Sequence, residues 1–348
     1  MADLDYPLPA EAIAQHPIEP RDAARLLVDR GPGQPPEHRH VRDLASLLRP
    51  GDLVVINDTR VVPARLHLRR ASGGAVEVLL LERTGHDRWE ALVRPSRKIK
   101  PGEQLSHDEL IVEIGEVLDS DGTRAVRICA DDPMAALAVH GSMPLPPYIT
   151  AALDDPDRYQ TVYARVPGAA AAPTAGLHFT DALLDRVREA TAGIERVELI
   201  VGLDTFRPVA VDDPDDHVMH SEAFVVSDAV LARCREVKRS GGRVVAVGTT
   251  TVRALESAAA GKSHRTDLFI RPGFDFQIVD VMMTNFHMPR TTLLLMVEAF
   301  IGERWRELYA TSLSEGYRFL SFGDAMLLER LTPAAGTPRA DLQTKSGT

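Results

Sequence analysis

The stretch RVVAVGTTTVRALES, residues 243–257, decides the fold class. Its opening apolar run is typical of a buried strand, and Gly248-Thr-Thr-Thr leads into a helix predicted over residues 252–260. The turn lacks the spacing of a G-x-x-x-x-G-K-[ST] loop, and no G-x-G-x-x-G follows a strand. Residues 243–257 therefore predict a strand–helix unit of an α/β protein that lacks a standard nucleotide-binding loop.

The same alternation of strands and helices runs from about residue 170 onward. Helices are predicted after the capping residues Thr180, Ser227 and Thr291 or Thr292, and another around residues 305–313. Strands are predicted over residues 197–201, 243–247 and 276–283. Upstream, residues 1–50 predict a short helix, a proline-rich bend and a second helix, and residues 53–56 predict a buried strand. We expect an α/β catalytic domain formed by residues 1–61 and 150–331.

Residues 62–149 have a different texture. Short runs at residues 64–69, 76–81, 89–93, 110–117 and 125–128 are separated by Gly, Pro and Asp, and no helix is predicted before about Met134. Evenly spaced short strands favour a small antiparallel β-barrel or sandwich, inserted into the α/β domain. Residues 332–348 have no periodicity and are predicted to form a disordered tail.

The composition sets outer limits on function. Of 348 residues, 44% are hydrophobic and 26% charged, which indicates a globular protein and excludes a collagen or coiled-coil class. Fifty acidic against 40 basic residues argue against a surface coated with nucleic acid, but a local basic patch remains compatible with them. Cys129 and Cys234, the only cysteines, exclude a thiolate metal site and are expected to be buried free thiols. The longest apolar run, residues 293–297, is too short to span a membrane, so a cytoplasmic protein without membrane contact is expected.

Three predicted junctions carry polar side chains just before a helix. They contain Thr174 and His178, then Gly248 to Thr250, and then Asn285 and His287. Helix N-termini attract anions, and ligands of α/β sheets gather at the carboxyl ends of strands. Plain helix capping by Ser and Thr is the alternative for each junction.

Two further clusters allow more than one interpretation. His217-Val-Met-His220-Ser-Glu222 offers general acid or base groups, although hydrogen-bonded loop histidines or, with a third ligand, a zinc site are alternatives. The basic run from Arg94 to Lys100 is compatible with phosphate contacts or with a solvated hairpin tip.

Eleven stretches, in order, cover nearly the whole chain and together resemble the S-adenosylmethionine:tRNA ribosyltransferase-isomerases of queuosine biosynthesis. They are QHPIEPRDAARLLV (15–28), NDTRVVPARL (57–66), MPLPPYI (143–149), YQTVYA (159–164), APTAGLHFT (172–180), VGLDTFRPV (201–209), HVMHSE (217–222), VAVGTTTVRALES (245–257), FIRPGFDFQIVD (269–280), TNFHMPRTTLL (284–294) and YRFLSFGDAML (317–327).

This resemblance implies a complex α/β barrel interrupted by a small β-barrel. It implies transfer of the ribosyl group of S-adenosylmethionine onto 7-aminomethyl-7-deazaguanine at the tRNA wobble position. The sugar rearranges to an epoxycyclopentane, and adenine and methionine leave. S-adenosylmethionine is then a consumed substrate, so no separate cofactor and no metal are expected. The partners implied are S-adenosylmethionine and the precursor-bearing tRNA, with the protein a monomer.

The resemblance and the polar junctions together give the candidate site residues. The candidate acid and base groups, whose individual roles stay open, are His178, His220, Glu222 and His287. The candidate substrate-binding residues are Asp58, Arg60, Thr174, Gly176, Asp204, Thr205, Gly248, Thr249, Thr250, Arg253 and Asn285. The candidate tRNA contacts are Arg94, Arg97 and Lys98.

Four positions depart from the family pattern. The family has His where Ile200 stands, Gly where Asp204 stands and Asn where Asp58 stands, and Thr150-Ala151 replaces an Arg after the L-P-P-Y-I segment. Two alternatives therefore stay open: a family member that cleaves S-adenosylmethionine for a different acceptor, whether tRNA or not, and a non-catalytic protein that binds S-adenosylmethionine or tRNA. We expect Asp204 to lie in the site and to tune the acceptor; the alternative is that Asp204 faces solvent or caps a turn.

Overall fold

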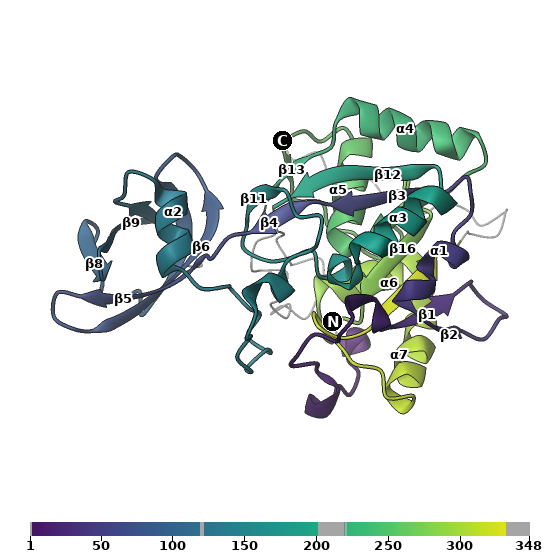
Figure 1. Cartoon of the computed structure of the whole chain (residues 1–348), viewed down its shortest axis with the longest axis horizontal. Coiled ribbons are helices and arrows are strands. Elements are labelled where there is room, and N and C mark those ends of the chain that lie inside the picture. Colours follow the sequence, from purple (N-terminus) through teal and green to yellow (C-terminus); the bar gives the residue numbers. More distant parts are fainter. Residues whose placement is uncertain (1, 119–121, 201–218, 220, 332–348) are drawn as a thin grey trace, which may run out of the picture.

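The computed structural model describes residues 2–118, 122–200, 219 and 221–331. A large sheet flanked by helices lies beside a small barrel (Figure 1). Within the described residues, no helix is long and apolar enough to cross a membrane.

The large sheet contains nine strands in one continuous order. The order is β15 (Arg265–Thr266), β13 (Glu222–Val225), β12 (Gly193–Leu199), β3 (Leu53–Asn57), β14 (Val244–Val247), β16 (Val281–Asn285), β17 (Ala325–Glu329), β1 (Arg25–Asp29) and β2 (Glu37–His40). Strands β12, β3, β14 and β16 run parallel to one another. Their carboxyl ends therefore meet at one edge of the sheet, where ligands of α/β proteins gather.

Both faces of this sheet are covered by helices. Along β3, Leu53 and Val55 pack into one apolar cluster and Val54 and Ile56 into another, as the period of two in a strand requires. The first cluster contains side chains of α4 (Asp228–Arg239), α5 (Thr249–Ala259), α6 (Thr292–Ile301) and α7 (Trp305–Ser314). The second contains side chains of α1 (Leu44–Leu47) and α3 (Asp181–Ala190). The result is a layered α/β domain with two cores.

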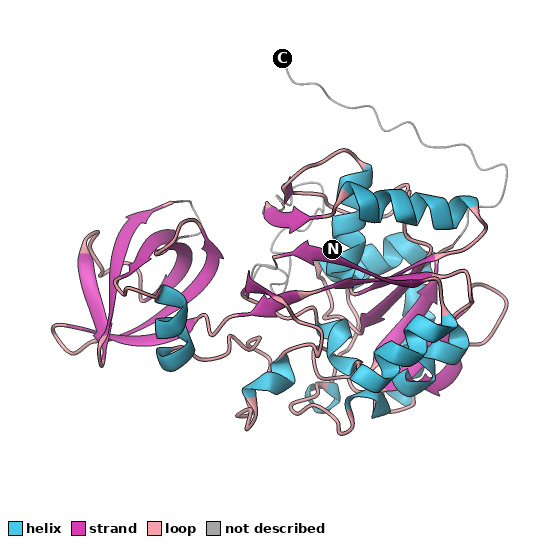
Figure 2. Cartoon of the chain, turned by 45° about the horizontal axis from the view of Figure 1, so that its top comes forward, coloured by secondary structure: helices cyan, strands magenta, loops and turns pink. Residues whose placement is uncertain are grey.

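The smaller unit is a closed antiparallel barrel (Figure 2). Its strands are β10 (Thr123–Ile128), β7 (Arg88–Arg94), β6 (Ala75–Arg83), β5 (Arg65–Arg70), β8 (Glu103–His107) and β9 (Leu110–Val117), and α2 (Pro133–His140) packs against them. The chain enters and leaves at one place, where Arg65 and Ser142 exchange two backbone hydrogen bonds of 3.2 and 2.9 Å.

Among the described residues, the connections between the barrel and the rest of the chain include a strand pair beside the barrel and an ion pair. Strand β4 (Thr59–Val61), which precedes the barrel, pairs in parallel with β11 (Val166–Ala169), which follows it. Arg265 of β15 also holds both carboxylate oxygens of Glu82 on β6, at 2.5 and 3.1 Å. The α/β class with a small antiparallel barrel is thus confirmed, whereas the domain boundaries at 61/62 and 149/150 stay predictions.

The predicted helix starts are confirmed, because Thr180, Ser227 and Thr291 each accept a backbone N–H with the side-chain oxygen. The predicted strand over 276–283 is wrong in its first half, since β16 begins at Val281. The backbone N–H groups of residues 277–279 donate instead to the buried carboxylate of Glu256, at 2.8 to 3.0 Å. Helix α5 also begins at Thr249, three residues before its predicted start.

The N-terminal prediction is the largest error. The sequence predicts two helices within residues 1–50. The second is present as four-residue α1, but the rest of this segment forms the strands β1 and β2 and short 3-10 turns. Of the two cysteines expected to be buried, Cys234 is buried and Cys129 only partly so.

Candidate active site

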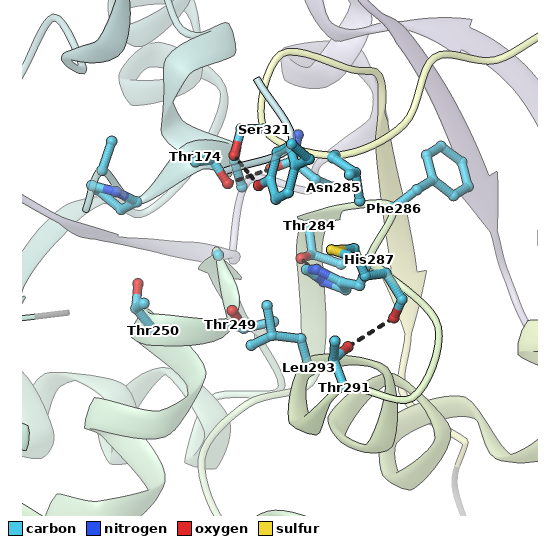
Figure 3. Close-up of a pocket in the computed structure, with 17 residues that line it drawn as sticks. Thr174, Thr249, Thr250, Thr284, Asn285, Phe286, His287, Thr291, Leu293 and Ser321 are labelled. Carbon is cyan, nitrogen blue, oxygen red and sulfur yellow. Dashed lines mark hydrogen bonds between the residues drawn. The ribbon is translucent and has the colours of Figure 1, made fainter. Parts of the chain in front are cut away.

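A pocket opens at the carboxyl edge of β14 and β16 (Figure 3). The 3-10 helix η6 (Thr174–His178), the first turn of α5 and the segment after β16 supply most of its wall. None of its described lining side chains is an Asp, Glu, Lys or Arg. The lining residues are Tyr148, Ala172, Pro173, Thr174, Ala175, Gly248, Thr249, Thr250, Thr284, Asn285, Phe286, His287, Met288, Thr291, Leu293, Leu320 and Ser321.

Gly248 turns the chain from β14 into α5. Its φ is 89°, in the left-handed region that favours glycine, and its N–H donates to the Met283 carbonyl at 2.7 Å. The first amides of a helix have no acceptor within the helix. Because Gly248, Thr249 and Thr250 all line the pocket, the positive end of α5 faces the space where a ligand would lie.

Asn285 links the pocket wall to His178. Its carbonyl oxygen accepts from the Thr174 hydroxyl at 2.9 Å, and its amide nitrogen lies 3.2 Å from Nε2 of His178. Because an amide NH₂ only donates, Nε2 is the acceptor and carries no proton. Burial, with Arg318 and Arg21 nearby, lowers the pKa of His178 to about 3. The imidazole is therefore uncharged at neutral pH.

His287 lies in the pocket wall itself, and hydrogen bonds fix both its backbone N–H and its backbone carbonyl. Its N–H donates to the Tyr309 hydroxyl at 3.0 Å, and the Tyr6 hydroxyl donates to its carbonyl at 2.5 Å. Nε2 lies 2.9 Å from the hydroxyl oxygen of Thr284, and both side chains face the cavity in Figure 3. Burial lowers the pKa of His287 to about 3. The pocket thus presents an uncharged imidazole, which accepts a proton but has no imidazolium proton to give.

Comparison with known proteins decides the family. The model of the family described as "Queuosine biosynthesis protein" matches residues 1–328. The chain belongs to this family. A relative from Symbiobacterium thermophilum, named S-adenosylmethionine:tRNA ribosyltransferase-isomerase, is 49% identical over 94% of this chain and 99% of its own length. A Moorella thermoacetica relative with the same name is 50% identical over 94% of this chain and 98% of its own length.

The family resemblance extends to a solved structure. The crystal structure of an S-adenosylmethionine tRNA ribosyltransferase from Thermotoga maritima is 37% identical in sequence, with a TM-score of 0.54. The match covers 93% of this chain and 99% of that one. The queuosine biosynthesis family fold therefore extends over the barrel as well as the α/β domain.

The pocket brings together part of the predicted site. Thr174, Gly248, Thr249, Thr250, Asn285 and His287 line it, and His178 lies directly behind Asn285. These residues share a location because their segments follow neighbouring strands or pack on the same sheet edge. Asp204, Thr205 and His220 lie outside the described residues, as does His217 of the alternative zinc site.

Glu222 and Arg253 lie elsewhere, paired with each other in an ion pair. Each is 8% exposed, and Arg253 also donates to the carbonyls of Leu268 and Thr266 at 3.0 and 3.2 Å. The pair ties β13 to α5, and neither side chain is among the lining residues of the pocket. In this arrangement the Glu222 carboxylate is held by a guanidinium away from the pocket wall.

Asp58 is also occupied by arginines. It is fully buried, and its Oδ2 lies 2.9 Å from Nε of Arg165 and 3.3 Å from Nη1 of Arg196. The carboxylate that stands here in place of the family's Asn is therefore balanced by two arginines of the same chain. The neighbouring Asn57 belongs to the polar cluster that ends the predicted strand but is not among the candidate site residues. It donates to the Thr250 hydroxyl at 3.3 Å and so contacts the pocket wall.

Gly176 is placed by packing. A Cβ on this buried residue would lie 2.0 Å from the Tyr163 hydroxyl, so the close approach of η6 to Tyr163 requires glycine. Arg60 is exposed on β4. Arg94, Arg97 and Lys98 are exposed at the connection from β7 to β8 on the barrel, outside the pocket.

The pocket includes residues that are not among the candidate site residues. Tyr148 and Ser321 share a 2.7 Å hydrogen bond across its rim, and Thr284 contacts His287. All three belong to stretches on which the family resemblance rests, MPLPPYI, YRFLSFGDAML and TNFHMPRTTLL. The signal is present in those stretches, and Thr284 even belongs to a predicted junction, but only Asn285 and His287 of that junction are among the candidate site residues.

Proposed function

We propose that this protein transfers and isomerises the ribosyl moiety of S-adenosylmethionine onto 7-aminomethyl-7-deazaguanine at the wobble position of tRNA. The products are epoxyqueuosine-tRNA, adenine and methionine. The observation that carries this proposal is the near-complete mutual coverage with relatives of that activity. At 49–50% identity, they match 94% of this chain and 98–99% of their own length, so nearly the whole length of each relative has a counterpart here.

The pocket supports this function through its neutral lining. A sulfonium substrate brings its own positive charge, and Arg or Lys side chains in the wall would repel it. The described lining residues include neither. The carboxylate of the methionyl group would lie at the positive end of α5, beside Gly248 and Thr249.

His287 is our candidate for the base. The sulfonium acidifies the neighbouring carbon-bound proton, which passes to an uncharged imidazole nitrogen. The electron pair left on carbon opens the ribose ring and expels adenine, which takes up a proton. The tRNA amine then attacks the activated carbon, and closure of the epoxide breaks the bond to sulfur and releases methionine. Burial keeps His287 neutral before the reaction and also lowers its affinity for a proton, so this transfer relies on the acidity that the sulfonium gives to the carbon.

The test is to follow adenine and methionine by chromatography after mixing the protein with S-adenosylmethionine. We expect equal amounts of both products, only when tRNA carrying the 7-aminomethyl precursor is present. Release without that tRNA would indicate another acceptor. Binding of both substrates without release would indicate a non-catalytic binding protein.

A variant pair tests the role of His287. His287→Asn should lower kcat by at least 100-fold, with little change in the affinity for S-adenosylmethionine, because general base catalysis contributes about 10²–10⁴-fold. His86→Asn is the matched control, since His86 is exposed on the turn between β6 and β7 of the barrel. Activity of His287→Asn within a few-fold of the parent would remove His287 from this role.

A further inference from the structure

Three side chains with metal-binding chemistry meet on the barrel, away from the pocket. His107 is the last residue of β8, Asp108 begins the turn into β9, and His140 is the last residue of α2. One ligand atom from each lies within 4.8 Å of the other two, and no second group of this kind occurs among the described residues. Figure 1 places α2, β8 and β9 on the barrel, whereas the pocket lies in the α/β domain.

The local geometry points the three groups at a common space. Nε2 of His107 lies 3.6 Å from Oδ2 of Asp108. The rings of His107 and His140 are 6.0 Å apart and nearly perpendicular, at 86°. Asp108 has a φ of 49°, in the left-handed region that Asp tolerates better than most residues. The turn thus brings a carboxylate beside an imidazole from the preceding strand and opposite one from a helix.

We propose that this cluster binds a divalent transition-metal ion of the Zn²⁺ type. Each histidine would supply one imidazole nitrogen and Asp108 one carboxylate oxygen, with the remaining position open to water. Two nitrogens and one oxygen match Zn²⁺, Co²⁺ or Ni²⁺, whereas Mg²⁺ and Ca²⁺ require mostly oxygen ligands.

The side chains need only small movements to close around an ion. With metal–ligand bonds of about 2.0–2.2 Å, the ligand atoms of a tetrahedral site lie about 3.3–3.6 Å apart. His107 and Asp108 have side chains that are 47% and 75% exposed, so they are free to rotate inward from the present separations. No spacing pattern signals this site, because His140 belongs to a different element far along the chain.

A metal here would join the hairpin β8–β9 to α2. Leu137 of that helix is fully buried in the barrel core, and the helix ends against the chain that enters the barrel, where a Cβ on Gly141 would lie 2.0 Å from the Pro63 carbonyl oxygen. Binding to the folded barrel would therefore stabilise it, because the ligands are brought together only by folding. Metal binding at this cluster does not depend on the proposed catalytic activity.

The test measures Zn²⁺ bound to the full, tag-free chain by competition with a chromophoric chelator, with metal content checked by mass spectrometry. We expect one ion per chain. His107→Ala, Asp108→Asn and His140→Ala should each weaken binding by at least 10-fold. His86→Ala, an exposed barrel histidine outside the cluster, should bind as the parent does, and Mg²⁺ should not compete.

Thermal unfolding provides a second readout. Zn²⁺ should raise the Tm of the parent and of His86→Ala, but not that of the His107→Ala/His140→Ala double variant, whose folding in the absence of metal is checked by circular dichroism. One bound ion that persists in the folded double variant would locate the metal elsewhere, for example at His217 and His220. That result, or the absence of micromolar binding by the parent, would overturn the proposal.

Discussion

Replacement of Gly176 by alanine should lower the free energy of unfolding, because the new methyl group would clash with the hydroxyl group of Tyr163. The new methyl group would lie 2.0 Å from the Tyr163 oxygen, and 2.9 Å from the ring carbon that bears it and from a methyl group of Thr161. Tyr163 is 6% exposed and cannot move freely. Its hydroxyl also has no hydrogen-bond partner in the described structure. The clash and the orphan hydroxyl are thus one feature, which Tyr163→Phe removes.

The magnitudes follow from these distances. Overpacking of a buried site costs about 1–3 kcal/mol, and the 2.0 Å contact places Gly176→Ala near ~3 kcal/mol. In the Tyr163→Phe background only the 2.9 Å contacts remain, which small shifts relieve at a cost of about 1 kcal/mol. Tyr163→Phe alone should leave the free energy of unfolding unchanged or raise it by about 1 kcal/mol, because an unsatisfied buried group is lost. The coupling energy between the two changes is then about 2 kcal/mol in favour of the double variant.

Urea denaturation of the four proteins measures this coupling. Calorimetric binding of S-adenosylmethionine provides a second readout, since Thr174, two residues before Gly176, lines the pocket. We expect Gly176→Ala to weaken binding and Tyr163→Phe to restore most of it. An equal penalty of Gly176→Ala in both backgrounds would refute the packing argument and return Gly176 to the candidate substrate contacts.

Two further predictions concern acidity and RNA. Burial lowers the pKa of His178 and His287 to about 3, whereas the unfolded chain protonates histidine below about pH 6.5. Their stabilising contribution is therefore complete above about pH 6.5 and is lost as pH falls toward 3, by up to ~1.4 kcal/mol per pH unit for each histidine. Urea denaturation at several pH values should show this slope, and a slope unchanged by His178→Asn/His287→Asn would contradict it. If the barrel contacts tRNA phosphates, Arg97→Ala/Lys98→Ala should weaken tRNA binding and flatten its salt dependence, whereas Arg88→Ala, a change at the other end of β7, should not. Identical salt slopes would leave residues 97 and 98 as a solvated tip.

The sequence predicted the features that depend on interactions between residues close together in the chain, such as the starts of helices. Thr180, Ser227 and Thr291 cap helices through their own following turn, so their effect is visible within a few residues. The parallel order of β14 and β16 likewise explains why Thr249 and His287 meet at one edge.

Long-range partners leave no local signal. Glu222 and Asp58 have the chemistry of site residues, and the structure pairs each with arginines that are distant in sequence, while their part in the site stays a prediction. The apolar residues at 276–279 alternate like a strand, yet their amides bind the carboxylate of Glu256. Neither pairing leaves a mark in the neighbouring sequence, because a buried charge is matched by whatever residue the fold brings to it.

The position of β1 has a consequence for synthesis of the chain on the ribosome. Strand β2 follows at once and covers one edge of β1, but the other edge pairs only with β17. That partner emerges about 300 residues later, which is roughly 15–60 s at 5–20 residues per second. During this interval Leu26, Leu27 and Val28, all buried in the finished protein, belong to a hairpin with an open apolar edge. Until β17 has been synthesised, that edge is therefore open to pairing with a strand of another chain.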